Sequence, residues 1–130
     1  MTGYLYVALG GAIGASLRHG VGQLAVRIAP DSDWPWGTFA VNILGSFVMG
    51  LLIGFLTFRG ELLPGGQNAR LFLATGVLGG FTTFSAFSLE VSRFVERGEM
   101  FSAAAYAGLS VILGLGGVLL GLALTRWIFA

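Results

Sequence analysis

Four long apolar stretches, separated by three short polar segments, account for nearly all of this chain of 130 residues. They run from about Tyr4 to Ile28, Trp36 to Phe58, Leu71 to Phe94 and Phe101 to Ile128. The hydrocarbon core of a bilayer is about 30 Å thick, and a helix needs roughly 20 apolar residues to cross it. The pattern therefore predicts an all-α integral membrane protein with four transmembrane helices in a single domain, residues 1–130.

The balance of residue types supports a membrane environment and argues against several other classes. Only 10% of the residues are charged, whereas soluble domains carry about 25% charged residues. All seven cationic side chains are arginines, and they form no basic patch with interleaved aromatics, so nucleic acid is not an expected partner. Cysteine is absent, which rules out disulfides and thiolate metal sites. No nucleophile–base pair or carboxylate pair is visible, so an enzyme is not predicted.

The first apolar stretch is predicted to be a membrane helix and not a cleaved signal peptide. A secretory signal has a basic amino-terminal region, and the only positive charge before Arg18 is the amino terminus itself. We therefore expect a multi-pass protein of the cell inner (plasma) membrane that is surrounded by membrane lipids.

The arginines provide almost no signal for the orientation of the chain in the membrane. With four crossings, both termini and the second connection share one side, which carries Arg59, Arg70 and Arg126, and the other side carries Arg27, Arg93 and Arg97. Positively charged loops stay cytoplasmic, so a count of three against three gives no bias. Either the first helix or the insertion machinery sets one orientation, or the chain inserts both ways and pairs in an antiparallel arrangement.

The three connections are short and contain the residues that end helices. The segment "APDSDWPWG" (29–37) is typical of an interfacial loop with an aromatic belt. The segment "RGELLPGGQNAR" (59–70) indicates a polar turn, and "RFVERGEM" (93–100) indicates a charged corner.

Pairs of glycines four residues apart predict where the helices pack against one another. Glycine at this spacing lets two backbones approach closely, which is how many membrane helices associate. The pairs are Gly10 with Gly14, Gly50 with Gly54, Gly76 with Gly80, and Gly117 with Gly121. We assign these glycines a packing role and no chemistry.

Polar side chains inside the apolar stretches are candidates for function, because they are costly to bury in a membrane. Arg18 has two interpretations: it attracts an anion, or it anchors the fold through a buried carbonyl. His19, beside it, is interpreted as an interfacial hydrogen-bond donor. Asn42 lies about five residues into the second stretch and needs partners for its amide. It either joins two helices or offers its NH₂ group to a pore.

The segment "GGFTTFSAF" (79–87) is unusual for a membrane helix, because paired glycines precede hydroxyls and phenylalanines. Gly79 and Gly80 are predicted to break the third helix, so that Gly79 to Thr83 interrupt it. Non-helical backbone at membrane depth is tolerated where it is buried in protein or lines a cavity. After the break, Phe84 and Phe87 fall on one helical face. Their positive ring edges either contact a small anion or serve ordinary aromatic packing.

Three motifs, one in each of the first three apolar stretches, resemble the Fluc/CrcB fluoride channel family. They are "GGAIGASLR" in the first stretch, "GTFAVNILG" in the second and "GGFTTFSAFSLE" in the third, and "AAAYAG" in the fourth is a weaker match. The motifs occur in order, and the layout covers essentially the whole chain. The resemblance implies a fluoride-selective channel that exports fluoride passively, built as an antiparallel, dual-topology homodimer with two pores.

The same resemblance implies roles for individual residues. Phe84 and Phe87 would present ring edges to fluoride, and Asn42 would be a pore donor. The residues near the polar side of the pore would be Ser85, Tyr106 and Ser110, with Glu90 near a vestibule. Ala86 stands where the family often has threonine, so one hydroxyl of the usual polar track is absent.

The resemblance also implies a structural sodium ion on the two-fold axis of the dimer. Backbone carbonyls of Gly79 and Thr82 from both subunits would enclose it, giving four oxygen ligands, which suit a hard cation. Sodium is the only cofactor that the resemblance implies.

Two other functions compete with a fluoride channel. A small proton-coupled multidrug exporter also has four spans and often dual topology, but it needs a membrane carboxylate. The first two stretches contain no Asp or Glu, and Glu90 lies toward the end of the third. A non-transporting assembly subunit is the other alternative. Whether transport needs a proton gradient separates the channel from the exporter.

Overall fold

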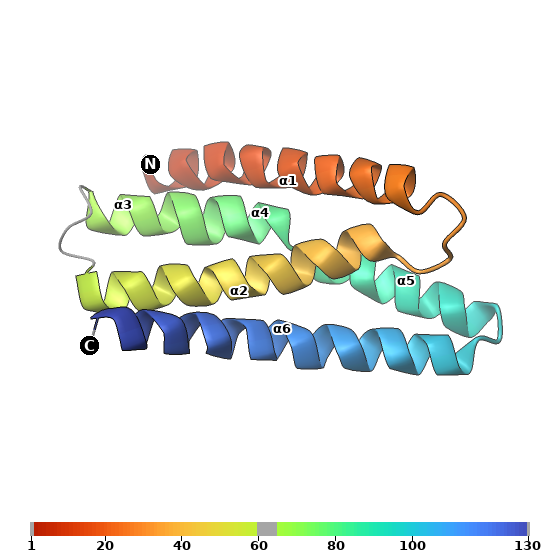
Figure 1. The fold of residues 1–130 in the computed structure, drawn as a ribbon. Coiled ribbons are helices and arrows are strands. Elements are labelled where there is room, and N and C mark those ends of the chain that lie inside the picture. Colours follow the sequence, from red (N-terminus) through yellow and green to blue (C-terminus); the bar gives the residue numbers. More distant parts are fainter. Residues whose placement is uncertain (1, 60–64, 130) are drawn as a thin grey trace.

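The computed structural model describes residues 2–59 and 65–129, and in this part of the chain it is helical with no strand. Figure 1 shows the elements running roughly parallel along one long axis. The helices are α1 (Thr2–Ile28), α2 (Trp36–Arg59), α3 (Gly66–Arg70), the π-helix η2 (Leu71–Leu78), α4 (Gly79–Phe81), α5 (Phe84–Glu96) and α6 (Met100–Phe129). The polar turn predicted at 59–70 falls partly on residues 60–64, which lie outside the described residues.

The predicted helices agree closely with the observed ones. The bounds of α1, α2 and α6 differ from the predicted stretches by one or two residues. The third stretch begins earlier than predicted, at Gly66, and consists of four helical pieces from α3 to α5. The break within it, predicted from the sequence, is present between α4 and α5.

Three segments of the described chain are long and apolar enough to cross a membrane: Trp36–Arg59, Gly66–Glu96 and Met100–Phe129. Helix α1 has sufficient length at 27 residues. Arg18 and His19 lie in its middle and reduce its hydropathy, so that α1 crosses the membrane stays a prediction.

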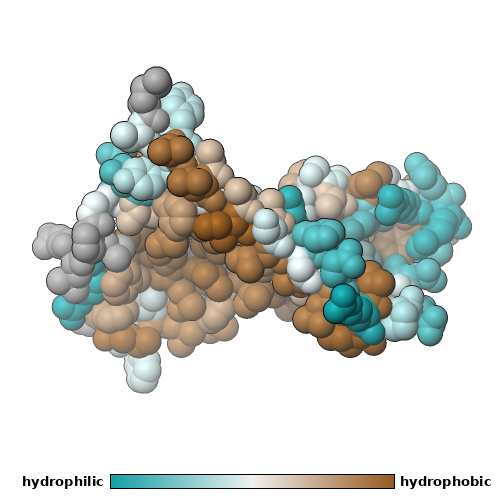
Figure 2. All heavy atoms as spheres, turned by 90° about the horizontal axis from the view of Figure 1, so that it is seen from above, coloured by the Kyte–Doolittle hydropathy of each residue, from teal (hydrophilic) through white to brown (hydrophobic). Residues whose placement is uncertain are grey.

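The bundle has two distinct ends. In Figure 1 the start of α1 and the end of α6 lie at one end, while the α1–α2 loop and the α5–α6 turn lie at the other. The last turns of α2, α3 and α6 carry Arg59, Arg70 and Arg126, and those of α1 and α5 carry Arg27 and Arg93. These five arginines lie at the helix ends expected from the sequence, and that the two ends face opposite sides of a membrane stays a prediction. Figure 2 shows apolar surface over much of the bundle and polar side chains gathered toward the loop end.

Glycines fix the two closest helix contacts, as predicted. A Cβ atom added to Gly10 in α1 would lie 2.9 Å from the Cα of Gly76 in η2. On the other side of the bundle, a Cβ on Gly121 of α6 would lie 2.6 Å from the backbone nitrogen of Leu51 in α2. The partners of Gly14, Gly50, Gly54, Gly80 and Gly117 are likewise atoms of the facing helix. Side chains at these positions would push the helices apart.

Gly80→Ala is expected to destabilise the protein although alanine is a better helix former. The added Cβ would lie 2.6 Å from the carbonyl oxygen of Gly11, a backbone atom that cannot move aside. Overpacking of this kind costs about 1–3 kcal/mol, so the thermal unfolding midpoint in detergent should fall. Gly116→Ala is the matched control, since its Cβ would meet no atom within 4 Å. Equal midpoints for both variants would contradict this packing.

A cluster of aromatic rings packs together at the loop end of the bundle. It contains Trp34, Phe39, Phe87, Phe94 and Tyr106, and is called the aromatic cluster below. Tyr106 lies at its centre and is fully buried. The cluster joins the α1–α2 loop to α2, α5 and α6, and one of its rings, Phe87, lines the site described next.

Candidate functional site

The third helical segment is broken at Thr82 and Thr83. Thr82 has φ −82° and ψ 156°, and Thr83 has φ −152° and ψ 118°, so both are extended. The prediction that Gly79 and Gly80 break the helix is wrong, because both lie in α4 and Gly79 has helical angles of −64° and −36°. Gly80 instead allows close contact with α1. The break begins three residues later than predicted, where hydroxyl side chains replace the lost backbone bonds.

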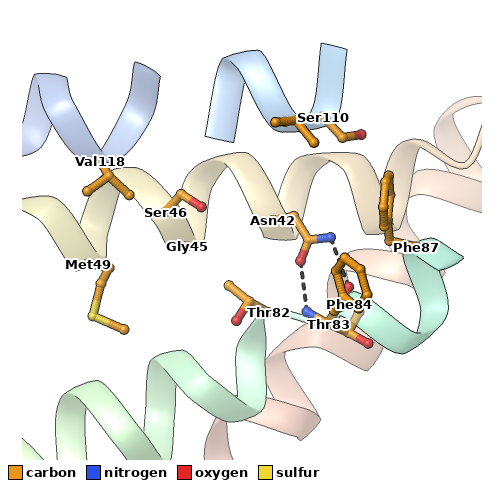
Figure 3. A pocket seen from close by; sticks show the side chains of 11 residues that line it. Asn42, Gly45, Ser46, Met49, Thr82, Thr83, Phe84, Phe87, Ser110 and Val118 are labelled. Carbon is orange, nitrogen blue, oxygen red and sulfur yellow. Dashed lines mark hydrogen bonds between the residues drawn. The ribbon is translucent and has the colours of Figure 1, made fainter. Parts of the chain in front are cut away.

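Asn42 of α2 holds the broken backbone in place through two hydrogen bonds. Its Oδ1 accepts from the Thr83 amide at 2.7 Å, and its Nδ2 donates to the Thr83 carbonyl at 3.0 Å. Figure 3 shows the Asn42 side chain pointing from α2 toward the break, with both bonds drawn as dashed lines. Asn42 therefore joins two helices, which is one of its two predicted roles. One of its two amide hydrogens is used in this contact.

Thr83 restarts the helix after the break. Its hydroxyl oxygen accepts from the Ala86 amide at 3.2 Å, which makes it the N-cap of α5. The same hydroxyl lies 3.2 Å from the Ser85 hydroxyl. Ser85 is thus part of the cap.

The break frees backbone carbonyls at the end of the third segment's first half, among them those of Gly79 and Thr82. In a continuous α-helix the Thr83 amide would donate to the Gly79 carbonyl, but here it donates to Asn42. The Ala86 amide would likewise donate to the Thr82 carbonyl, but it donates to the Thr83 hydroxyl. The carbonyls of Gly79 and Thr82 therefore lose the donors that helical geometry would give them.

Arg18 reaches the break from α1. Its Nη1 donates to the freed Thr82 carbonyl at 3.3 Å. Of the two interpretations of Arg18, this contact favours the anchor, because the guanidinium compensates a carbonyl that the break exposes. His19 beside it is exposed.

A groove of about 310 Å³ lies between α2, α6 and the break. It is called the central groove below, and Figure 3 shows the residues that line it. The lining includes Asn42, Ser46, Thr82, Phe84, Phe87 and Ser110. No charged side chain from the described part of the chain is among the residues of this lining. The groove combines aromatic rings with an amide and hydroxyls.

Two of the lining residues stand out by their environment. The Phe84 and Phe87 rings lie 5.6 Å apart, as predicted for one helical face, yet the Phe84 side chain is 79% exposed. The Ser110 hydroxyl is buried and has no hydrogen-bond partner within the described residues. The exposed ring can face lipid or a partner, whereas the buried hydroxyl without a partner is the kind of group that a bound ion or water satisfies.

Glu90 forms a polar network behind the central groove. Its two carboxylate oxygens accept from the hydroxyls of Thr38 and Tyr106, each at 2.6 Å. The network links α2, α5 and α6. Glu90 also lines two cavities, one of about 300 Å³ beside the α1–α2 loop and one of about 140 Å³ that includes Arg93 and Arg97.

The structure brings part of the predicted site together. Asn42, Phe84, Phe87 and Ser110 line the central groove. The residues that do not line it are Arg18, Gly79, Ser85, Glu90 and Tyr106; Tyr106 packs against Phe87 with ring centroids 5.5 Å apart.

Sequence reasoning missed Thr38 and Ser46, whereas the bond of the Thr83 hydroxyl to a freed backbone amide is one that hydroxyls after a break were expected to make. Thr38 and Ser46 are each four residues from Asn42, so they fall on the same helical face, and that spacing was available as a signal.

Asn42→Leu is expected to destabilise the break. The Thr83 amide would be left buried without an acceptor, which costs about 1–3 kcal/mol. The thermal unfolding midpoint in detergent should fall. Ser46→Ala is the control, because it alters the same groove and Ser46 takes part in none of the bonds at the break. If Asn42→Leu melts like the unaltered protein, the two hydrogen bonds do not hold the break.

The fold and the groove define the chain as a small all-helical membrane protein with an interrupted helix beside a groove of aromatic and polar groups. A family model described as "CrcB-like protein, Camphor Resistance (CrcB)" matches residues 5–122. The chain belongs to this family of CrcB-like proteins.

Similar curated proteins carry a functional name. The chain is 62% identical to a "Fluoride-specific ion channel FluC" from Hyphomonas neptunium, over the whole of both chains. It is 53% identical to a protein of the same name from Novosphingobium aromaticivorans, covering 97% of this chain and 98% of that one. These names describe ion channels and not enzymes. The resemblance inferred from the motifs is confirmed.

Proposed function

We propose that this chain is a fluoride-selective ion channel that lets fluoride leave the cell passively and so lowers cytoplasmic fluoride. The observation that carries the proposal is the central groove, where aromatic rings, an amide and a hydroxyl line a space without a charged side chain. The names of similar proteins support the same function. Fluoride efflux from liposomes that contain the purified protein tests it.

The groove offers several modest donors to a small anion. The second amide hydrogen of Asn42 is not used at the break, and the Ser110 hydroxyl has no partner within the described residues. Phe84 and Phe87 add ring edges, which carry partial positive charge. Conduction needs binding that is favourable enough for entry and weak enough for exit. A cationic side chain in the groove would hold fluoride too tightly, so uncharged donors suit a channel.

We propose that two chains assemble as an antiparallel homodimer with dual topology in the inner (plasma) membrane. The Phe84 ring is 79% exposed beside the polar break, so it is free to meet a second copy of the chain. In the most apolar stretch of 18 residues in α6, only 6% of the stretch is buried within the described chain. Much of this helix is therefore free to face lipid or a second copy. The equal distribution of arginines between the two ends is compatible with insertion in both directions.

A structural sodium ion between the two subunits is also part of the proposal. The Gly79 and Thr82 carbonyls fit such an ion, because the break removes the amides that would donate to them. Arg18 occupies one direction at the Thr82 carbonyl, and a carbonyl oxygen has two lone pairs. When bound, the ion would neutralise the carbonyl dipoles that meet at the dimer axis.

Replacing sodium with N-methylglucamine on both sides of the membrane is expected to lower fluoride flux. A large organic cation cannot enter a site formed by four carbonyl oxygens. Without sodium, the partial negative charges of these oxygens at the proposed dimer interface are no longer neutralised. Adding sodium back should restore flux, which separates this effect from protein damage. Equal flux in both buffers would remove sodium from the proposal and leave the channel itself intact.

The exporter alternative finds less support. Its mechanism needs a carboxylate that is free to exchange a proton for substrate, and Glu90 has both oxygens engaged by Thr38 and Tyr106. Fluoride efflux that is unaffected by collapsing the proton gradient would separate the channel from the exporter.

A further inference from the structure

Trp34 connects the surface loop between α1 and α2 to the interior of the bundle. Its indole packs edge-on against Tyr106, with centroids 5.3 Å apart and planes at 88°. It also contacts Phe39 at 5.9 Å and Phe94 at 6.3 Å. One loop residue therefore contacts three other rings of the aromatic cluster.

The loop is held in a defined conformation next to Trp34. The Ser32 hydroxyl oxygen accepts from the Trp34 amide at 3.2 Å and from the Trp36 indole nitrogen at 3.0 Å. The bond from the Trp34 amide fixes the position of the Trp34 backbone, so its ring enters the cluster from a set direction.

Tyr106 transmits this position to the central groove. Tyr106 is fully buried, and its ring lies 5.5 Å from that of Phe87, at an angle of 42°. Its hydroxyl is fixed by Glu90 at 2.6 Å. Trp34 supports the ring of Tyr106, and that ring supports Phe87. Among the described residues, the two rings that pair with Phe87 are those of the exposed Phe84 and of the buried Tyr106, so its buried ring contact is with Tyr106.

The contribution of Trp34 is one of shape and not of hydrogen bonding. Its indole nitrogen is buried and has no hydrogen-bond partner within the described residues. A buried donor without an acceptor is unfavourable, so the ring contacts must outweigh that cost. Phenylalanine at this position would keep a ring edge toward Tyr106, whereas leucine would not.

We infer that Trp34 is a positioning residue for the groove, which sets the orientation of the Phe87 ring through Tyr106 and thereby the flux and selectivity for fluoride. The inference rests on the proposed function. The interaction of a ring edge with an anion depends on its angle, so a ring that is free to tilt is a poorer donor and a looser barrier to chloride.

The test compares Trp34→Leu with Trp36→Leu in liposomes at matched protein incorporation. Trp36 is the first residue of α2 and contacts Trp34 and Phe39, but no ring contact joins it to Tyr106 among the described residues. Its replacement leaves the bond between Ser32 and the Trp34 amide in place. Trp34→Leu is expected to lower fluoride flux roughly three- to tenfold, the scale of a lost aromatic pair, and to lower the ratio of fluoride to chloride permeation. Trp36→Leu should leave that ratio unchanged.

A second measurement does not depend on transport. 4-Fluorophenylalanine in place of Phe87 reports the environment of that ring by fluorine NMR, and its resonance should move with Trp34→Leu and not with Trp36→Leu. If Trp34→Leu does not fold, Trp34→Phe decides, with a smaller change expected in flux ratio and resonance.

The possible results distinguish an error in the inference about Trp34 from an error in the proposed channel function. If the unaltered protein conducts fluoride and the Trp34 variants match it in flux, selectivity and Phe87 resonance, the inference about Trp34 is wrong. The proposed channel function is not affected by that result. An unaltered protein that conducts no fluoride overturns both.

Discussion

Phe84→Ile and Phe87→Ile are each expected to reduce fluoride flux by at least about tenfold, equivalent to roughly 1.4 kcal/mol in the barrier. Isoleucine keeps much of the bulk and removes the positively polarised ring edge. Both rings line the central groove beside the Asn42 amide. The measurement is fluoride efflux from liposomes, with dimer content checked by crosslinking.

The two variants should differ in stability. Phe84 is 79% exposed in the single chain, so Phe84→Ile should leave the unfolding midpoint nearly unchanged. Phe87 packs against the buried Tyr106, so Phe87→Ile should lower it. Phe101→Ile is the control for an exposed ring outside the groove, since Phe101 is 87% exposed at the start of α6. If both groove variants conduct normally, the rings serve packing and this pore assignment is wrong.

Biasing the charge at one end of the bundle is expected to abolish transport. Lysines added at one end hold that end in the cytoplasm, so all copies insert the same way and no antiparallel pair forms. Two matched variants do this at opposite ends: Glu96→Lys with Glu99→Lys near the α5–α6 turn, and Gln67→Lys with Asn68→Lys in α3. The salt bridge that Glu99 makes with Arg97 is exposed, so its loss costs little.

The decisive observation is co-expression. Each variant alone should conduct no fluoride, and the two together should restore conduction, because oppositely inserted copies can then pair. Reporter fusions at the carboxyl terminus should signal from both sides of the membrane for the unaltered chain and from one side for each variant. Full conduction by either variant alone would contradict the antiparallel dimer.

Helix positions and helix contacts were predictable because both depend on local patterns. The lengths of the apolar stretches placed α1, α2 and α6 to within two residues. The glycine pairs predicted which faces meet, since close approach requires the absence of a side chain. The "GGFTTF" segment predicted a break in the third helix because of its paired glycines, with hydroxyls beside them that can bond to freed backbone groups.

The details of the site depended on contacts between distant residues and were not predictable in the same way. Gly79 and Gly80 were assigned to the break because glycine often disrupts helices, but Gly80 serves the contact with α1. The break occurs where Asn42 competes for the Thr83 amide. The network of Glu90 with Thr38 and Tyr106 joins three helices, and no local spacing in one helix reveals such a network.

The central claim is tested most directly by comparing fluoride with chloride efflux from liposomes that contain only this protein. Vesicles are loaded with equal concentrations of the two salts, and ion-selective electrodes follow each anion after valinomycin releases the potassium counter-charge. We expect rapid fluoride efflux that persists without a proton gradient, with chloride retained until detergent is added. Retention of fluoride, or release of both anions at equal rates, would contradict the account.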